Sequence, residues 1–324
     1  YIQTVHSAVL KMNENDLNGS QNEWEQLLRM NSNNYLAYKG LGRIADYRGD
    51  YRQAMDYFKL AYAQEEYALS YQQLRQKSLE NHALWIVFGV VALLVAAIVG
   101  VKRLARYLAV APANQAYSRL ESRSGMPLYV LRHPVDGFSQ FKRRHIGSWS
   151  LAAVIVFLWL VASVTEYYGT GFAFAINRNV DFNMAIRVAV TVGVFAAFVL
   201  SNWIVSIILD GNGSLKDITA TAAYSLIPYI LSLFLKVGLT NVLIPAESVF
   251  IDILLIVGLL WSGVLLFLGL MTIHEFSVGR TIWSLLLTLV GMIIIVFLII
   301  LLYSLVRQLA DFIVSVYKEF RFRS

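Results

Sequence analysis

Two short stretches of the chain have residue types that could bind a metal ion. His274 and Glu275 are adjacent, as in the His-Glu pair of zinc proteases, but the sequence HEFSV holds no second histidine at the required spacing. The stretch DGNGSLKDITAT (210–221) begins like a calcium-binding loop. However, Leu215 stands where that loop needs glycine, and Thr221 stands where it needs a bidentate glutamate. We therefore expect no metal site and interpret 210–221 as a glycine-rich turn.

Other signatures of catalysis are missing from the sequence. It contains no phosphate-binding P-loop, no Gly-x-Ser-x-Gly nucleophile motif and no cysteine. The histidines are dispersed along the chain, at His6, His82, His133, His145 and His274. We therefore predict a protein that is not an enzyme, with no catalytic residue and no bound cofactor.

Two charged residues inside apolar stretches are candidates for an ion pair. Lys236 lies near the end of one apolar stretch and Asp252 near the start of the next, so a helical hairpin would bring them to a similar depth. A charge at mid-membrane costs about 2.5–3.5 kcal/mol on insertion scales, which favours pairing. We predict that Lys236 pairs with Asp252, within a polar cluster that also holds Glu166, Arg187 and Glu247. The alternative is that each side chain reaches the interface separately.

The chain is far more apolar than an ordinary soluble domain. Of its 324 residues, 57% are hydrophobic and 15% are charged. A helix rises about 1.5 Å per residue, so about 20 apolar residues cross the hydrocarbon core of a bilayer. Pro228 lies in one such stretch and should kink it, because proline removes a backbone hydrogen bond. Six stretches are apolar enough to span: 83–101, 148–166, 185–209, 221–240, 248–271 and 281–306.

The polar residues before the first apolar stretch contain an internal repeat. At a spacing of 34 residues, Ser20 aligns with Ala54 and Trp24 aligns with Phe58. The second copy resembles a tetratricopeptide repeat (TPR), in which small residues stand where paired helices approach closely. Gly42 is one such small residue, and an aromatic side chain fills the space between repeats.

We accordingly predict that residues 1–81 form a TPR-like module of two repeats and a capping helix. Its core would contain Trp24, Gly42, Ala54 and Phe58. Two repeats and a cap are close to the minimum for a stable stack. Surfaces of the TPR family bind proteins or peptides, so the resemblance implies docking. The alternative is a plain helical spacer.

Basic residues are concentrated after the first predicted span. Residues 102–147 hold nine Lys or Arg against two acidic residues, a net charge of +7. Residues 1–82 hold nine basic and ten acidic residues and show no such bias. The positive-inside rule then places the 102–147 loop in the cytoplasm and the N-terminal module outside the cell membrane. Successive spans leave the C-terminus outside, although Lys318, Arg321 and Arg323 mildly oppose this.

These features divide the chain into five predicted segments. They are the TPR-like module 1–81, a first transmembrane helix 82–104, a basic cytoplasmic linker 105–147, a five-span membrane domain 148–306 and an amphipathic C-terminal tail 307–324. We expect the last helix to continue beyond the bilayer into this tail. Near the end of the linker, Lys142, Arg143 and Arg144 are flanked by aromatic residues. Such a cluster gains about 1 kcal/mol per basic residue at anionic headgroups. The alternative is that these charges only set the topology.

Residues 131–302 resemble the Yip1 family of five-span membrane proteins. The stretch HPVDGFSQFKRRHIGSWSLAAVIVFLWL (133–160) is similar to the entry of bacterial members. AAYSLIPYILSLFL (222–235) resembles the Tyr-Ser-x-x-Pro span of the family, and IHEFSVGRTIWSLLL (273–287) the polar elbow before its last span. The resemblance implies a five-helix bundle with a cytoplasmic N-terminus. The leading span and repeat module are additions that the eukaryotic trafficking members lack.

Bacterial proteins of this arrangement resemble accessory components of sugar-importing ATP-binding-cassette (ABC) systems. We predict an all-α, polytopic and non-enzymatic membrane scaffold. The resemblance implies permease subunits as partners, the basic cluster predicts contact with anionic lipid headgroups, and no nucleic acid is expected to bind. The all-α module outside would dock a protein partner. Two alternatives stay open: a stand-alone transporter or channel, and a membrane sensor that relays an external signal.

Overall fold

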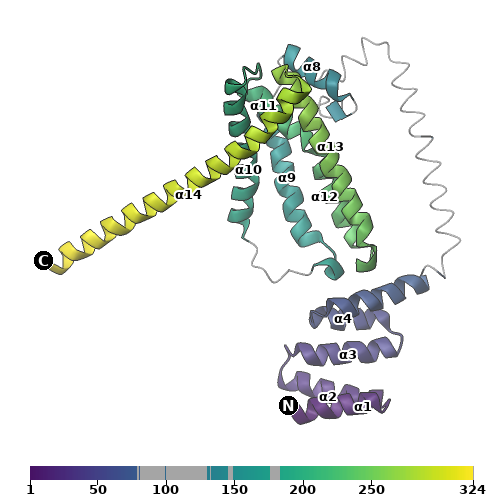
Figure 1. Ribbon diagram of the computed structural model, residues 1–324. Coiled ribbons are helices and arrows are strands. Elements are labelled where there is room, and N and C mark those ends of the chain that lie inside the picture. Colours follow the sequence, from purple (N-terminus) through teal and green to yellow (C-terminus); the bar gives the residue numbers. More distant parts are fainter. Residues whose placement is uncertain are drawn as a thin grey trace. The chain divides into compact units, whose positions relative to one another are not determined.

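The computed structural model describes residues 1–78, 80, 99, 130–131, 133–144, 149–175 and 183–323 (Figure 1). Within these residues all regular structure is helical, which confirms the all-α class. The predicted first span and most of the basic linker lie outside the described residues. The chain forms two compact units: 1–113 with 165–181 and 234–254, and 114–164 with 182–233 and 255–324.

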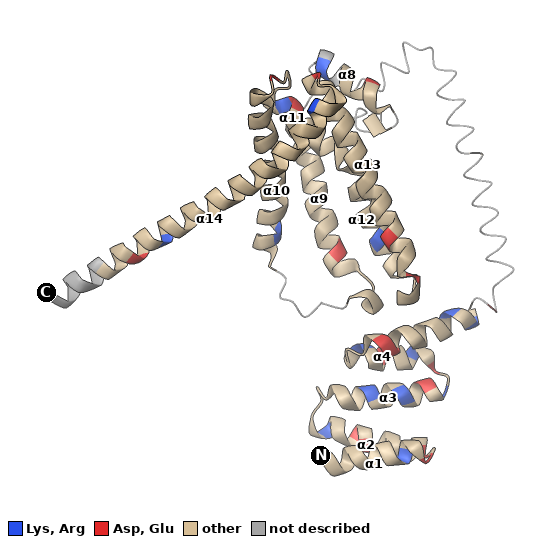
Figure 2. Ribbon diagram, viewed as in Figure 1, with Lys and Arg blue, Asp and Glu red and all other residues tan. Residues whose placement is uncertain are grey.

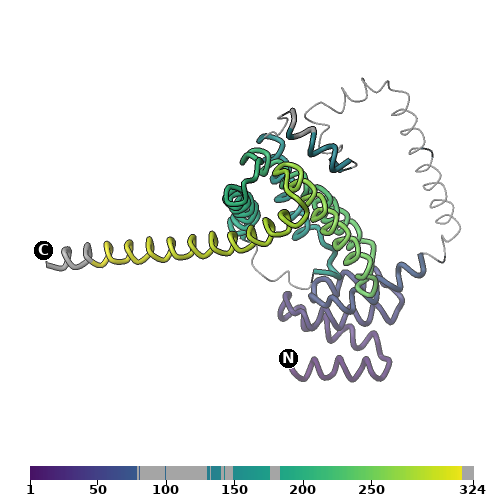
Figure 3. Tube along the Cα trace, turned by 45° about the horizontal axis from the view of Figure 1, so that its top comes forward, coloured from purple at the N-terminus to yellow at the C-terminus, as the bar shows by residue number. Residues whose placement is uncertain are grey.

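The N-terminal residues form a stack of antiparallel helices, here called the head (residues 1–78). Its helices are α1 (Ile2–Asn13), α2 (Leu17–Met30), α3 (Tyr35–Tyr47), α4 (Tyr51–Leu60) and a further helix over 64–78. Each of these helices lies beside the one that precedes it in the chain, as Figures 1 and 3 show. Asp16, Asn34 and Asp50 cap α2, α3 and α4, each accepting a hydrogen bond from a backbone N–H in the first turn.

Large and small residues alternate in the core of the head. Trp24, Ala54 and Phe58 are buried, as is Gly42. A Cβ atom added at Gly42 would lie 2.6 Å from Cε1 of Phe58, and one added at Gly40 would lie 2.3 Å from Cε2 of Trp24. Each aromatic ring therefore packs directly on the backbone of α3, which explains why small residues stand at these two positions.

The remaining described residues supply five helices long and apolar enough to cross a membrane, which confirms a multi-pass membrane protein. Figure 2 shows few charged residues along these helices. The candidate spans are Trp149–Gly169, Met184–Ile208, Leu215–Thr240, Pro245–His274 and Val278–Ser315. They belong to α9 (Trp149–Gly169), α10 (Met184–Ile208), α11 (Leu215–Ser225) with α12 (Ile227–Thr240), α13 (Ser248–His274) and α14 (Val278–Arg323). Short helices α8 (Pro134–Arg144), η1 (Phe172–Phe174) and η2 (Pro245–Glu247) flank them.

The third of these spans is broken in the middle. Helix α11 ends at Ser225, and α12 begins at Ile227, just before Pro228. Proline has no N–H to donate, so the carbonyl four residues earlier loses its helical partner. The N–H of Tyr229 donates to Oγ of Ser262 on α13, at 3.1 Å. A hydroxyl of a neighbouring helix thus satisfies backbone at the break, as the interior of a membrane requires.

Helices α10 and α14 pack through small and hydroxyl side chains. Oγ of Ser201 donates to the carbonyl of Thr288 at 2.7 Å, and Nδ2 of Asn202 donates to Oγ1 of Thr288 at 2.9 Å. A Cβ atom at Gly291 would lie 2.2 Å from Oγ of Ser201. Close approach of helices and interhelical hydrogen bonds hold such contacts together where the hydrophobic effect is weak.

Helix α14 is much longer than a bilayer requires. It runs for 46 residues without interruption, so the predicted tail over 307–324 continues the last predicted span, 281–306, in a single helix, as the sequence analysis expected. Its second half extends away from the other helices of its unit in Figures 1 and 3. Accordingly, its side chains from Leu298 to Val314 are exposed in the structure.

Candidate functional site

The head carries a groove between α1, α2 and α3. It encloses about 840 Å³ and is lined mainly by apolar side chains, among them Val5, Val9, Met12, Leu17, Leu36 and Tyr47. Trp24 also lines it and is only 3% exposed, and its indole Nε1 has no hydrogen-bond acceptor among the described residues. A buried donor without an acceptor costs free energy, so a ligand that supplies one would gain by binding here.

Two cations line the same groove and share one carboxylate. Nζ of Lys39 lies 2.6 Å from Oε1 of Glu66, and the guanidinium of Arg43 lies 3.6 Å from that oxygen. Partial burial acts to raise the pKa of Glu66, but the hydrogen bond from Lys39 and the charge of Arg43 outweigh it and hold the pKa below its usual value. The groove therefore combines an apolar floor with a charged edge, at which Lys39 and Arg43 stand in the lining together with the acidic Asp46.

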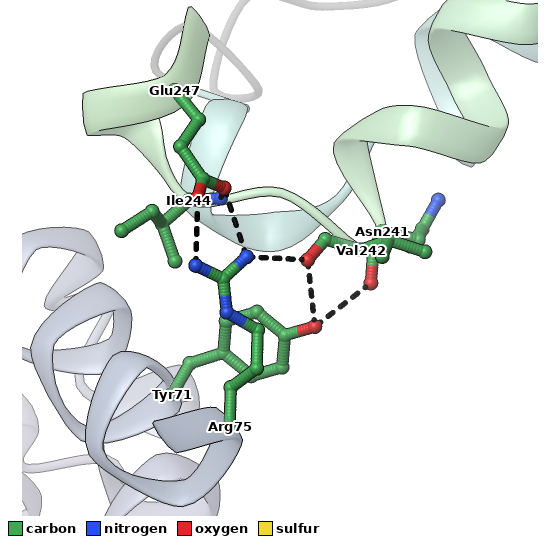
Figure 4. Close-up of polar contacts among 6 residues, drawn as sticks. All are labelled: Tyr71, Arg75, Asn241, Val242, Ile244 and Glu247. Atoms are coloured by element: carbon green, nitrogen blue, oxygen red, sulfur yellow. Dashed lines mark hydrogen bonds and ion pairs between the residues drawn. The ribbon is translucent and has the colours of Figure 1, made fainter. Parts of the chain in front are cut away.

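One face of the helix over 64–78 contacts the two loops that follow α9 and α12. Gln64 donates to the carbonyl of Ala175 at 2.7 Å, and the ring of Tyr67 meets the edge of Phe172 with centroids 4.9 Å apart. The hydroxyl of Tyr71 donates to the carbonyl of Val242 at 3.1 Å (Figure 4). The contacting residues recur every three or four positions, which places them on one side of the helix. The head is thus attached to these loops along a continuous strip.

The strip ends in a two-point ion pair. Both terminal nitrogens of Arg75 lie 2.8 Å from the oxygens of Glu247, and one also donates to the carbonyl of Val242 at 3.3 Å (Figure 4). The hydrogen bond to Glu247 raises the pKa of Arg75 above its usual value. Oε2 of Glu247 also accepts from the N–H of Ile244, so the carboxylate is positioned by its own loop. Planar, bidentate pairing fixes orientation as well as distance.

Lys236 pairs with Glu166 rather than with Asp252, its predicted partner. Nζ of Lys236, on α12, lies 2.5 Å from Oε1 of Glu166, on α9. Asp252 is exposed on α13. Glu166 is near the end of α9, and Asp252 is near the start of α13. Depth in the membrane alone therefore allowed either carboxylate as the partner of Lys236, and the rotation of the helices about their axes selects Glu166. Of the predicted polar cluster, Glu166 does contact Lys236. Glu247, another predicted member, forms its ion pair with Arg75 instead.

His274 is the centre of a buried polar network at the end of α13. The side chain is 1% exposed. Its Nδ1 accepts from the N–H of Gly213 at 3.2 Å, and its Nε2 lies 3.2 Å from Oδ1 of Asn202, which assigns the proton to Nε2. A Cβ atom at Gly213 would lie 2.7 Å from the imidazole. Both ring nitrogens are thus engaged, and the histidine joins the 210–213 turn to α13.

Beside this network, Glu275 holds helix α8. Nζ of Lys142 lies 2.7 Å from Oε1 of Glu275, and Nδ2 of Asn212 donates to Oε2 at 2.9 Å. The side chains of Arg143 and Arg144, the other members of the predicted basic cluster, lie outside the described residues. Lys142 therefore has a carboxylate partner within the protein in addition to any lipid it meets.

Metal ligands do not gather in the described part of the chain. No group of three or more His, Cys, Asp or Glu side chains there is close enough to hold an ion. Glu275, next to His274, points instead to Lys142 and Asn212. The side chains of His274 and Glu275 can thus hold α8 and the 210–213 turn against the end of α13 through hydrogen bonds and an ion pair.

Comparison with protein families assigns the membrane helices. The model of the Yip1 domain matches residues 128–305, more than half of the chain. The chain belongs to the Yip1 family. No curated protein and no solved structure matches it. The matched range begins before α8 and ends within α14. The Yip1 domain therefore contains the first four candidate spans and most of the fifth, and it excludes the head.

The motifs that suggested the Yip1 family have clear places in the structure. Ser225 and Pro228, from the Tyr-Ser-x-x-Pro stretch, flank the break between α11 and α12. His274 and Glu275, from the polar elbow, join the last two spans of the Yip1 domain to the 210–213 turn and to α8. These residues therefore act on the arrangement of helices.

Sequence reasoning missed the residues that attach the head to the Yip1 domain. Tyr67, Tyr71 and Arg75 were assigned only to a capping helix. Their spacing of four, with two aromatics and a cation on one side of a short helix, is the signal that marks this side as a contact surface. Asn202 was also missed, although an amide in an apolar span needs a partner within the protein.

Proposed function

We propose that this Yip1-family protein is a non-enzymatic accessory subunit of a membrane transport complex, with the head outside the cytoplasm as a docking module. The complex would be a carbohydrate ABC importer of the kind that the resemblance implies. Permease subunits would pack on the spans, and a protein partner would bind the head groove. The observation that carries the proposal is the apolar groove at Trp24, whose buried N–H has no acceptor in the described residues.

The chemistry of the groove indicates what it would bind. Val5, Val9 and Leu36 offer apolar surface, and the N–H of Trp24 needs an acceptor such as a backbone carbonyl. Lys39 and Arg43 share the charge of Glu66 and line the groove together with Asp46, so this edge offers polar groups without a surplus of positive charge. A peptide segment with an apolar side chain and a free backbone carbonyl meets the two requirements of apolar surface and an acceptor, in keeping with a TPR-like module.

The contact between head and loops supports the proposed orientation. Arg75 binds Glu247 in the loop between α12 and α13, and this contact supports a topology in which the head and this loop share one side of the membrane. The charge bias places the basic linker in the cytoplasm, and the loop after α12 is then on the opposite side. We propose this topology, with the C-terminus also outside.

Topology is testable because the chain has no cysteine. A single cysteine at the exposed Ser32 of the head is compared with one at the exposed Gly279, in the first turn of the last span. We expect a membrane-impermeant maleimide to label Ser32→Cys in intact spheroplasts, and to label Gly279→Cys only after permeabilisation. The reverse pattern would place the head in the cytoplasm and overturn the docking proposal.

Partner binding is tested with a groove variant and a matched surface variant. Val9 lines the groove and is 43% exposed, whereas Leu60 lies outside it and is 54% exposed. We expect permease subunits to co-purify with the protein in constant ratio in mild detergent. Val9→Glu should reduce the head-bound partner, and Leu60→Glu should not.

A solitary protein would favour the alternative of a stand-alone transporter. The discriminating result is elution without partners, combined with solute flux in liposomes that contain only this chain. The described spans do not favour this alternative, because the hollow between them is apolar (below) and gives a polar solute no hydrogen-bonding path.

A further inference from the structure

The Yip1 domain contains a hollow between α9, α10, the α11–α12 break and α13. It encloses about 320 Å³. Its walls are mainly large apolar side chains: Trp159, Phe195, Phe198, Leu226, Leu259 and Leu266. All of these residues belong to a single compact unit of the chain. From this hollow we infer that the domain holds the acyl chain of a membrane phospholipid.

The depth of the hollow determines what surrounds it. Trp159 is the central residue of α9, and Phe195 lies at the centre of α10. Leu226 occupies the break in the middle of the third span, and Leu259 lies near the centre of α13. Because the middle of each span coincides with the middle of the bilayer, the hollow lies where the surrounding medium consists of lipid tails.

The polar groups of the lining exclude other ligands. No charged residue stands among the described residues that line the hollow, and the two hydroxyls there already have backbone partners. Oγ of Ser225 donates to the carbonyl of Thr221 at 2.8 Å, and Oγ of Ser262 accepts from the N–H of Tyr229 at 3.1 Å. An ion, a sugar or a lipid headgroup would lose its hydrogen bonds to water, and the lining would not replace them. A hydrocarbon chain makes no such hydrogen bonds and has none to lose.

The hollow is also accessible from the bilayer. Val194 and Leu259 at its rim are 46% and 60% exposed, and a Cβ atom added at Gly263 would meet nothing within 4 Å. No residue of α14 lines it. An empty hollow forfeits dispersion contacts along its walls, so a lipid tail that enters restores them. A bound tail distinguishes this position from the rest of the lipid-facing surface, where tails exchange freely.

Two glycine variants test the inference in the full-length protein. Gly263→Leu adds a side chain at the rim of the hollow. Gly193→Leu adds the same side chain at an exposed site of α10 outside it, where a Cβ atom also meets nothing within 4 Å. After thorough washing in detergent, native mass spectrometry should find a single phospholipid retained by the wild type and by Gly193→Leu. Gly263→Leu should lose most of it.

A second variant guards against a folding artefact. Ala222 lines the hollow from α11, so Ala222→Leu fills it from the opposite side. In variants that keep the thermal transition of the wild type, either filling substitution should reduce lipid retention. Retention of the phospholipid by both filled variants, retention of an isoprenoid in its place, or a wild type free of lipid would each overturn the inference.

Discussion

Arg75 and Glu247 are 172 positions apart in the chain, yet they meet through two hydrogen bonds of 2.8 Å. This pair joins the last described helix of the head to the loop between α12 and α13. The Yip1 model matches residues 128–305, so the contact links a loop within the matched range to a helix outside it. Specific side chains therefore hold the helix over 64–78 against a loop of its own compact unit.

Loss of this pair should loosen the head without unfolding it. Arg75→Ala removes both hydrogen bonds to Glu247. The only remaining partner of this carboxylate among the described residues is then the N–H of Ile244 in its own loop. The side chains are 25% and 30% exposed, so solvent screens the pair and we expect a coupling of about 1 kcal/mol in a double-mutant cycle with Glu247→Ala. Hydrogen exchange in residues 64–78 should accelerate in each single variant.

A surface substitution provides the control for that measurement. Arg52 is an exposed arginine on α4, away from the strip that contacts the loops. Arg52→Ala should leave exchange in residues 64–78 at the wild-type rate. Equal acceleration by Arg52→Ala, or additive effects of the Arg75 and Glu247 substitutions, would show that the pair does not hold the head.

The Lys236–Glu166 pair should behave as a coupled unit inside the membrane. Removal of either partner leaves the other charge uncompensated at low dielectric, which we expect to cost about 2 kcal/mol. The double variant Lys236→Ala/Glu166→Ala should be more stable than the sum of the single effects predicts, by about 1 kcal/mol or more. Thermal unfolding in detergent measures each term.

Asp252 supplies the comparison that separates this pair from the partner first predicted. Because Asp252 is exposed on α13 and the ion pair of Lys236 is with Glu166, the effects of Lys236→Ala and Asp252→Ala should add. Strong coupling between Lys236 and Asp252, together with additivity between Lys236 and Glu166, would contradict the structure.

The contact between α8 and Glu275 should weaken in acid. The hydrogen bonds from Lys142 and Asn212 hold the pKa of Glu275 below its ordinary value. A carboxyl group whose pKa is depressed by folding stabilises the folded arrangement above its unfolded pKa of about 4.3, and this stabilisation is lost as pH falls through the depressed value. We therefore expect hydrogen exchange in α8 to increase as pH falls below about 4.3, once intrinsic exchange rates are corrected.

Substitution of Glu275 identifies the responsible group. Glu275→Gln keeps the shape of the side chain but removes its charge, so α8 should exchange rapidly at neutral pH and lose the acid response. If the variant retained the acid response of the wild type, another carboxyl group would be its source.

Much of the fold could be predicted because it follows from local chemistry. The length of apolar stretches sets which helices cross a bilayer, and Pro228 marks the break in the third span without knowledge of its neighbours. Asp16, Asn34 and Asp50 each stand directly before a head helix as side-chain caps. These features depend on a few consecutive residues, so spacing and residue type are sufficient.

The side-chain partners could not be predicted, because they depend on how distant helices rotate against each other. Lys236 has two carboxylates within reach of its depth, and only the facing of α9 and α12 selects Glu166. Arg75 and Glu247 come from segments with no pattern in common. The continuation of the last helix beyond the bilayer, by contrast, could be predicted, because charges such as Arg307 and Asp311 do not interrupt a helix.

Crowding at Gly42 should control the stability of the head. A methyl group at this position would lie 2.6 Å from Cε1 of Phe58, a ring that is buried and has little room to move. Overpacking of this kind costs about 1–3 kcal/mol, so Gly42→Ala should lower the temperature at which protease cleaves the head in the full-length protein. Leucine at position 58 is smaller than phenylalanine and relieves the clash. Gly42→Ala should therefore lower the cleavage temperature less in the Phe58→Leu background than in the wild type. No rescue in the double variant would mean that the ring does not pack on the backbone of α3.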